Sequence, residues 1–404
     1  MTQTLHAAAQ HALETTTAIV PERLPSPFYG DEHLQLFRSA ARWAHAHAAS
    51  PADGDPAALT RRLVRQMGDD GLLTQAVPPP GQQRVDIRSF CAVREGMAFH
   101  SGLVEVAFAM QAISAAPLAP FQHDALCAEY LEGVRRGHHV AGFALTEPQG
   151  GSDVQGIATT ARREGGHYVL DGRKAWISNG GAADFYVLVA RTGEPGARDA
   201  LSAFLLDADT PGLRVEPVRT LSRHPLAHLS LDNCRVPAQR LIGEPGAGFR
   251  IAMANLQAFR PSVGACAVGF ARRALHECLQ RMGSRTQFGQ RMLDMDAVQA
   301  KLADMHIAIE TAVLAVEEAA SAIDAGRSDA GHSSSIAKLV ATESAFQVID
   351  SAVQLFGAEG LAEGCIVEQL WREIRALRIG EGASEIQKLL IARSTMQTPK
   401  PTPN

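Results

Sequence analysis

Five segments place polar residues and glycines inside otherwise apolar stretches, and their side chains are the ones suited to chemistry. The first segment, Phe143–Asp153, reads FALTEPQGGSD. Its glycines let the backbone approach a ligand closely, while Thr146 and Ser152 offer hydroxyl groups. Ordinary turn residues in a connecting loop explain the same composition. On its own, this segment is better interpreted as a loop.

Two further segments combine one large side chain with polar neighbours. Trp176, in the run Trp176–Asn179, can stack on a flat ring or fill a hydrophobic core, and a core is the better default. Arg285, in the run Arg285–Gly289, can hold a phosphate or stand solvated at a helix end. Neither segment identifies a ligand by itself.

The last two segments lie towards the C-terminus. Gln354–Gly357 reads as a helix end with leucine and phenylalanine in the core and a glycine stop. In Ile379–Ser384, Glu381 lies between two glycines. A carboxylate on flexible backbone beside an apolar cavity can act as a general base, and otherwise it is a loop glutamate.

Several other chemistries lack their motifs. The sequence has no GxGxxG, no Walker loop and no GxSxG turn, so a Rossmann-type nicotinamide enzyme is disfavoured. None of the six cysteines forms a CxxC pair. His224 and His228 flank Pro225, which excludes a helix, so we expect loop histidines there. The site is therefore expected to hold no metal.

The hydrophobic pattern predicts helices, then strands, then helices. Helical periodicity covers Leu34–Ala48, Val85–Ile113 and Asp124–Arg136. Apolar runs of strand length are Phe185–Ala190, Ala203–Leu206 and Leu213–Val218, and Asp171-Gly172 is a hairpin turn signal. Helical periodicity resumes at Phe249. The pattern predicts a mainly α fold with a central antiparallel β domain, divided as 1–138 (helical), 139–242 (compact β domain) and 243–404 (helix bundle).

Composition excludes several classes of protein. The 404 residues are 46% hydrophobic and 20% charged, which is ordinary for two or three folded domains. The net charge of -5 argues against a nucleic-acid binder. No apolar run approaches the ~18 residues that a membrane-spanning helix needs, and no secretory signal is evident, so we expect a cytoplasmic protein away from membranes.

Seven motifs in register resemble the acyl-CoA dehydrogenase family from about residue 30 to residue 394. They are FALTEPQGGSD, YVLDGRKAWISNGG, CRVPAQRLIGEPGAGFRIAM, SRTQFGQ, KLADM, AVQLFGAEG and EGASEIQKLLIAR. The resemblance implies a helical domain, a β-barrel, a four-helix bundle and bound FAD. It also implies a homotetramer built as a dimer of dimers, with an electron-transfer flavoprotein as acceptor.

The resemblance assigns roles by position. Glu381 is implied as the base that takes the α-proton of an acyl-CoA thioester, while hydride leaves Cβ for the flavin. The implied FAD contacts are Leu145, Thr146, Gly151, Ser152, Trp176, Ile177, Ser178, Arg285, Gln287, Phe288, Gln354, Leu355, Phe356, Gly357 and Ser384. The implied substrate contacts are Ser152, Gln257, Arg260, Gly380 and Gly382.

The sequence departs from the family pattern in ways that bear on the substrate. Gly380 stands where a tyrosine commonly precedes the base, which indicates space for a branched, cyclic or bulky acyl group. Gln257 replaces an aspartate near the coenzyme A end, so a carrier-protein thioester is an alternative substrate. Asp296 replaces a glutamine near the adenine, and Ala383 replaces a threonine near the flavin. Phe259 occupies the position of the base in some relatives and cannot take a proton.

Three functions remain open at this point. The leading interpretation is an FAD-dependent acyl-CoA dehydrogenase that forms a trans-2-enoyl-CoA. The second is an acyl thioester oxidase in which O2 re-oxidises the flavin. The third is a non-catalytic flavoprotein, which the presence of Glu381 disfavours.

Overall fold

A computed structural model of the protein describes residues 20–21, 23, 26–48, 54–121, 124–194, 197 and 200–396. The described chain forms two compact units. Unit 1 is built from the described part of Gln35–Leu256, and unit 2 from the described parts of Pro21–Leu34 and Gln257–Asn404. The division into three domains stays a prediction.

The helices of the N-terminal part begin at capping side chains. They are α2 (Asp31–His47), α3 (Pro56–Asp69), α4 (Ile87–Ala98), α5 (Gly102–Ala115) and α6 (Ala125–Arg135). Asp55, Asp86, Ser101 and Asp124 each accept a backbone N–H from the first turn of α3, α4, α5 and α6. Such caps satisfy N–H groups that have no partner within the helix. The Ser101 cap is the reason why the predicted helix Val85–Ile113 is two helices.

One segment corrects the expectation that no stretch is long and apolar enough to cross a membrane. Gly102–Phe121, which is α5 followed by the 3-10 turn η2 (Ala116–Phe121), meets that test by length and composition. Its 18-residue apolar window is 83% buried inside the protein. Burial of this extent is what the core helix of a folded domain shows, because its apolar side chains already have protein neighbours.

An eight-stranded sheet forms the rest of unit 1. Its strands are β1 (Ala141–Ala144), β2 (Thr160–Glu164), β3 (His167–Ser178), β4 (Phe185–Arg191), β5 (Leu201–Asp207), β6 (Leu213–Val218), β7 (Leu226–Pro237) and β8 (Leu241–Ile242). The order is β6-β7-β3-β2-β4-β5-β8, with β1 paired to β4. The predicted runs at 185–190, 203–206 and 213–218 are confirmed as β4, β5 and β6.

Two expectations about the sheet need correction. The sheet is mixed rather than antiparallel, because β1 runs parallel to β4. Within the described residues, β6 and β8 stand at the two ends of the path and do not pair with each other, so hydrogen bonds do not close a barrel.

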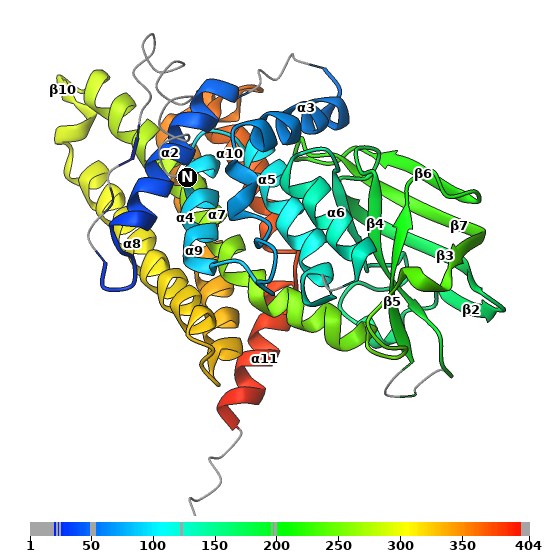
Figure 1. The fold of residues 1–404 in the computed structure, drawn as a ribbon. Coiled ribbons are helices and arrows are strands. Elements are labelled where there is room, and N and C mark those ends of the chain that lie inside the picture. Colours follow the sequence, from blue (N-terminus) through cyan, green and yellow to red (C-terminus); the bar gives the residue numbers. More distant parts are fainter. Residues whose placement is uncertain are drawn as a thin grey trace, which may run out of the picture. The chain divides into compact units, whose positions relative to one another are not determined.

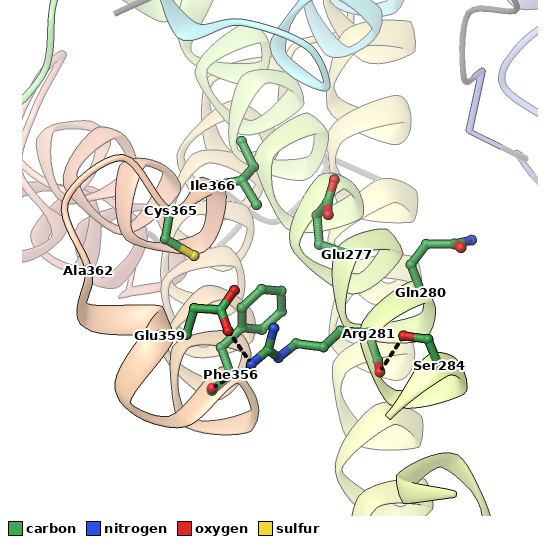
Figure 2. Close-up of a pocket in the computed structure, with 9 residues that line it drawn as sticks. All are labelled: Glu277, Gln280, Arg281, Ser284, Phe356, Glu359, Ala362, Cys365 and Ile366. Atoms are coloured by element: carbon green, nitrogen blue, oxygen red, sulfur yellow. Dashed lines mark hydrogen bonds and ion pairs between the residues drawn. The ribbon is translucent and has the colours of Figure 1, made fainter. Parts of the chain in front are cut away.

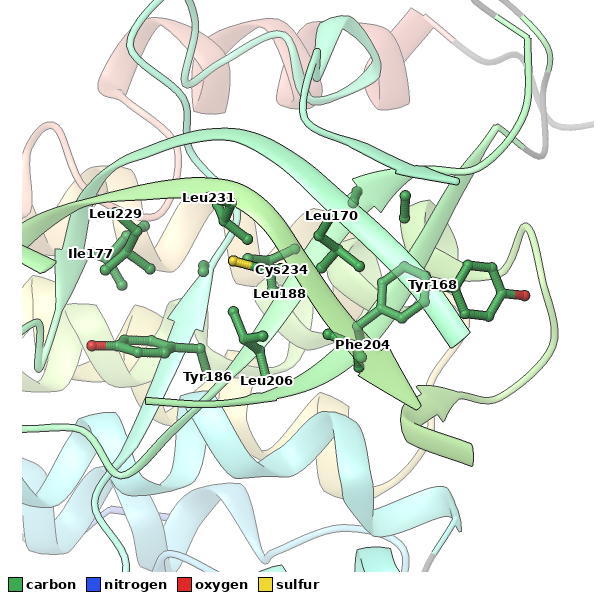
Figure 3. Packing of buried hydrophobic residues seen from close by; sticks show 14 of the residues in the cluster. Tyr168, Leu170, Ile177, Tyr186, Leu188, Phe204, Leu206, Leu229, Leu231 and Cys234 are labelled. Carbon is green, nitrogen blue, oxygen red and sulfur yellow. The ribbon is translucent and has the colours of Figure 1, made fainter. Parts of the chain in front are cut away.

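Alternating side chains build the core of the sheet (Figure 3). On β4, Tyr186, Leu188 and Ala190 enter one apolar cluster with residues of β3, β5 and β7. The intervening residues of β4 are also buried, because α5 packs against β1 and β4 (Figure 1). A strand covered on both faces reads as a continuous apolar run, which is the pattern seen in the sequence.

Asp171-Gly172 is not a hairpin turn, so the sequence-based prediction of a turn at this pair is wrong. β3 continues through this pair, and its pairing with β7 shifts register between Leu170 and Gly172. Gly172 has φ +150°, and a Cβ there would lie 2.6 Å from the Thr159 hydroxyl oxygen. The pair is a bulge that only glycine fits. The turn between β2 and β3 is Gly165-Gly166 instead, where Gly165 has φ +58°.

The C-terminal part is helical, as expected. Its helices are α7 (Gly248–Ser284), α8 (Asp296–Asp324), α9 (Ala330–Phe356), α10 (Ile366–Leu377) and α11 (Ser384–Met396). Helix α9 packs against α8, α10 and α11. Gly357 caps α9 with φ +67°, which confirms the predicted helix stop. Short 3-10 turns complete the described chain at η1 (Leu72–Gln75), η3 (Val154–Gly156), η4 (Ala238–Arg240), η5 (Met292–Asp294) and η6 (Gly357–Leu361).

The bulge makes a direct prediction about stability. Gly172→Ala is expected to lower the free energy of unfolding by about 1–3 kcal/mol, because the added methyl group meets Thr159 in a strained backbone. Circular dichroism during heating measures the effect as a lower melting temperature. Gly166→Ala is the matched control, since a Cβ at Gly166 has no neighbour within 4 Å. Equal melting temperatures for the two variants would contradict the assignment of the bulge.

Candidate active site

The segment after β1 and the end of β3 lie together in unit 1. The Ala175 N–H donates to the Thr146 carbonyl oxygen at 2.9 Å. The pairing of β3 with β7 shifts register between Lys174 and Ile177, so Trp176 lies in a second bulge. Leu145 and Ile177 are buried, while Thr146 and Ser178 are half-buried. The structure therefore brings the two predicted flavin-contacting segments into one patch.

A buried ion pair fixes this patch from inside the unit. Lys174 Nζ lies 2.8 Å from Glu147 Oε1 and donates to the Leu145 carbonyl oxygen at 3.1 Å. Both charged side chains are almost fully inaccessible to solvent. Glu147 also accepts the N–H groups of Ala158 and Thr159, at 2.7 and 3.0 Å. Since both charges have partners, this burial is tolerated and the loop after β1 is held to β3.

The same contacts explain the ionisation of Glu147. Burial alone would raise the pKa of this carboxyl group, but the Lys174 ammonium and the N–H donors lower it to about 2. Glu147 is therefore a charged anchor over the working pH range and cannot serve as a general base. Its position within the FALTEPQGGSD segment is structural.

Trp176 presents a flat apolar surface outward. Its side chain is 54% exposed, although its backbone adopts the left-handed region at φ +59°. The His228 ring packs edge-on against it, with centroids 4.9 Å apart. Residues held in strained backbone cluster at ligand sites, and an exposed tryptophan beside polar loop atoms suits a planar ring such as isoalloxazine. The default interpretation of Trp176 as a core residue is wrong.

The glycine-rich end of the first segment is more open. Gly151 and Ser152 are exposed, and a Cβ on Gly151 would lie 3.4 Å from the Thr146 methyl group. Gly151 is thus close to the patch. Their roles towards FAD and substrate stay predictions.

Unit 2 carries Glu381 in the turn between α10 and α11. Glu381 has φ +53° and Gly382 has φ +93°. The buried Lys338 of α9 donates to the Gly382 carbonyl oxygen at 2.9 Å. The buried Gln387 of α11 donates to the same oxygen at 2.9 Å and to the Glu381 carbonyl at 3.4 Å. These contacts fix the backbone from which the Glu381 carboxylate projects.

Arg260 lies near Glu381 and is placed by a break in the bonding of α7. Pro261 has no N–H, so the carbonyl oxygen of Gln257 loses its helical donor. Ser334 of α9 donates to that oxygen instead, at 2.7 Å. Burial lowers the pKa of Arg260, an effect that the Glu381 carboxylate opposes. Arg260 Nε is buried without a hydrogen-bond partner among the described residues, and it can therefore serve a bound acceptor.

The other predicted site residues near Glu381 are either buried with an internal partner or exposed. Ser384 is buried and donates to Glu343 at 2.5 Å, while Arg378 pairs with the same carboxylate at 2.8 Å. Ser384 thus has an internal partner, and its contact with FAD stays a prediction. Gly380 is exposed, and Gln257 is exposed with its amide against Gly331.

The Arg285 segment is a short hairpin after α7. Strands β9 (Thr286–Gln287) and β10 (Gln290–Arg291) pair across Phe288-Gly289. Phe288 is 95% exposed with φ +53°, and Arg285 is exposed at the helix end. With its amide oxygen turned towards Arg285, Gln287 accepts from Nη2 at 2.9 Å. The hairpin is preorganised to present an aromatic ring and a guanidinium group.

The Gln354–Gly357 segment borders a pocket of about 680 Å³ (Figure 2). Phe356 is buried in its lining, Gln354 and Gly357 are exposed, and Leu355 is half-buried. The Arg281 guanidinium lies 4.7 Å from the Phe356 ring centroid and pairs with Glu359 at 2.6 Å. The pocket is open and polar at this end, and it lies entirely within unit 2.

The two histidines of HPLAH have separate environments. His224 precedes β7, and its Nδ1 shares a hydrogen bond of 3.0 Å with the Ser222 hydroxyl group. Burial lowers the pKa of His224 to about 4. His228 lies in β7 itself, so the prediction of a loop position is wrong for this residue. Its contact with Trp176 makes it part of the patch in unit 1.

Sequence reasoning missed the buried anchors Glu147, Lys174, Lys338 and Gln387. A compositional signal was available, because only five of the 38 basic residues are lysines. Two of these five lysines, Lys174 and Lys338, are fully buried.

Comparisons with known proteins agree with this geometry. Residues 142–234 match the family model described as acyl-CoA dehydrogenase, middle domain, and residues 246–396 match acyl-CoA dehydrogenase, C-terminal domain. The chain is 34% identical to the cyclohexane-1-carbonyl-CoA dehydrogenase of Geobacter metallireducens over 90% of this chain and 96% of that protein.

Two solved structures share the fold. One is the butyryl-CoA dehydrogenase of Megasphaera elsdenii, with a TM-score of 0.83 and 27% identity over 93% of this chain and all of that one. The other is a chain from the electron transferring flavoprotein structure of Acidaminococcus fermentans, with a TM-score of 0.84, 27% identity and the same coverage. The protein therefore belongs to the acyl-CoA dehydrogenase family, as an FAD-dependent oxidoreductase that acts on acyl-CoA.

Proposed function

We propose that the protein converts an acyl-CoA thioester to the trans-2-enoyl-CoA, with Glu381 as the base. The observation that carries this proposal is the turn at Glu381, whose strained backbone is held by two buried side chains beside the buried Arg260. Strain is retained where function needs a side chain in one direction. A solvated loop glutamate would need none of these contacts.

The chemistry makes separate demands on the chain. An α-C–H is a weak acid until the neighbouring carbonyl is hydrogen-bonded, so the Glu381 N–H is proposed to bind the thioester oxygen. The Glu381 carboxylate then takes the α-proton, and the buried Arg260 supplies positive charge beside it. FAD, when bound, supplies the acceptor for the hydride that leaves Cβ.

We assign the FAD contacts by three kinds of observation. Leu145, Thr146, Trp176, Ile177 and Ser178 form the patch with the exposed tryptophan. Arg285, Gln287 and Phe288 belong to the hairpin after α7, and Phe356, within Gln354–Gly357, lines the pocket of unit 2. Gly151, Ser152 and Ser384 are assigned by position only. A homotetramer also stays a proposal.

The acyl group is proposed to be branched, cyclic or otherwise bulky. A Cβ on Gly380 would meet only the Ala376 carbonyl oxygen, at 3.6 Å, and the backbone at Gly380 is outside the left-handed region. Backbone geometry therefore does not require glycine there, so its small size is available for specificity. The relative from Geobacter metallireducens, whose name gives a cyclic acyl group, supports the same substrate class.

Glu381→Gln is expected to keep FAD and lose at least a hundredfold in the rate of flavin bleaching by substrate, because an amide cannot accept the proton. Anaerobic stopped-flow absorbance measures this rate. Glu363→Gln, at an exposed glutamate before α10, is the control and should match the wild type. Bleaching at the wild-type rate in Glu381→Gln would remove Glu381 as the base.

Gly380→Tyr is expected to lower kcat/KM for cyclohexane-1-carbonyl-CoA at least ~10-fold relative to butyryl-CoA, since the ring fills the space left by glycine. Steady-state assays with both thioesters on the same FAD-loaded preparation measure the ratio. An unchanged ratio means that Gly380 does not set the size of the acyl site.

An electron-transfer flavoprotein is proposed as the acceptor. In air without an added acceptor, the rate of hydrogen peroxide formation is expected to be far below the rate of turnover with that flavoprotein, because a thioester bound at the flavin would keep solvent and oxygen away from it. A peroxide assay measures the difference. Equal rates would favour an oxidase.

A further inference from the structure

Lys338 is buried in unit 2 and belongs to none of the site motifs considered in the sequence. It lies in the middle of α9, and its side chain has no exposed surface. Placing an ammonium group out of water is costly unless other groups compensate the charge. Leucine or methionine would fill the same helix position without this cost, so we looked for a role of the Lys338 charge.

The compensation comes from the turn that carries Glu381. Lys338 Nζ donates to the Gly382 carbonyl oxygen at 2.9 Å. Gln387 donates to the same oxygen, so one carbonyl accepts from a charged and a neutral donor. A hydrogen bond from a charged donor is roughly twice as strong as a neutral one. The peptide after Glu381 is therefore held in one orientation.

The charges around Lys338 come from the turn after α10 and from α7, α9 and α11. Glu381 in the turn, Glu343 on α9 and Glu385 on α11 attract the ammonium group, while Arg260 on α7 repels it. Burial lowers the pKa of Lys338 to about 8, so it is mostly protonated below that pH. The Glu381 carboxylate thus faces two buried cations, Lys338 and Arg260.

We propose that Lys338 is a positioning residue for the general base: it fixes the backbone that carries Glu381 and places a positive charge near that carboxylate. This inference rests on the proposed role of Glu381. Lys338 acts through Glu381 and through the Gly382 carbonyl, and it takes no proton from the substrate. A nearby cation favours the charged form of a carboxylate, so its removal makes protonation easier.

Two variants separate the two effects. Lys338→Met removes the donor and the charge, whereas Lys338→Gln removes the charge but keeps a neutral N–H donor on a shorter side chain. Lys301→Met, at a partly exposed lysine of α8, is the matched control. All are loaded with FAD, and the pH dependence of anaerobic flavin bleaching by an acyl-CoA that the wild type oxidises is compared.

In Lys338→Met, we expect bleaching to slow by about 10- to 100-fold with a smaller change in KM, because the base is misplaced. The acidic limb of its pH profile should move up by ~1 unit. Lys338→Gln should recover part of the rate at high pH but keep the shifted limb. Amide hydrogen exchange in the peptide covering 379–384 should accelerate more in Lys338→Met than in Lys338→Gln.

Specific results overturn the inference. If both Lys338 variants bleach with the wild-type rate and pH profile, Lys338 has no positioning role. If Lys338→Met does not fold, Lys338→Gln decides alone through its pH profile, and an unshifted limb refutes the charge effect. A wild-type protein that no acyl-CoA bleaches refutes the proposed function itself, which distinguishes the two failures.

Discussion

Two buried lysines constrain the two loops on which the proposed function depends. Lys174 donates to the carbonyl oxygen of Leu145 in unit 1, and Lys338 donates to that of Gly382 in unit 2. Each ammonium group is stable in the interior only while its partners stay in place. Each buried charge therefore holds one loop in place, and these loops carry residues to which we assign a chemical role.

Backbone strain marks the same places. Among the described residues, five that are not glycine have positive φ, namely Trp176, Asn179, Asn233, Phe288 and Glu381. All but Asn233 fall in segments that the sequence singled out for chemistry. Strained conformations persist where surrounding contacts fix them. Trp176 lies in a strand bulge, Phe288 lies in the turn of a short hairpin, and Glu381 precedes a carbonyl group that accepts two hydrogen bonds. Asn233 lies opposite Asp171, where the pairing of β3 with β7 is irregular, and its N–H donates to the Asp171 carboxylate. The irregular strand pairing accounts for its positive φ.

The sequence was sufficient for the helical character of the two outer parts, for the strands β4, β5 and β6, and for the segments that contain Glu381 and Trp176, but it missed α3 and the break between α4 and α5. Periodicity and glycine stops report local structure, so they succeed wherever neighbours along the chain decide the outcome. They fail at Gly172, where a long-range approach of Thr159 turns an apparent hairpin into a bulge. They also fail at Lys338, since burial depends on packing that spacing does not reveal. The exposure of Trp176 required the register of β3 against β7.

The central claim is that this chain dehydrogenates an acyl-CoA thioester across Cα–Cβ. Anaerobic mixing of the FAD-loaded wild type with cyclohexane-1-carbonyl-CoA, followed by flavin absorbance and by the mass of the thioester, tests it most directly. The account predicts loss of the oxidised-flavin absorbance together with a thioester lighter by two hydrogens. Unchanged flavin and unchanged thioester, with this substrate and with straight-chain, branched and aryl-substituted acyl-CoA thioesters alike, would contradict it.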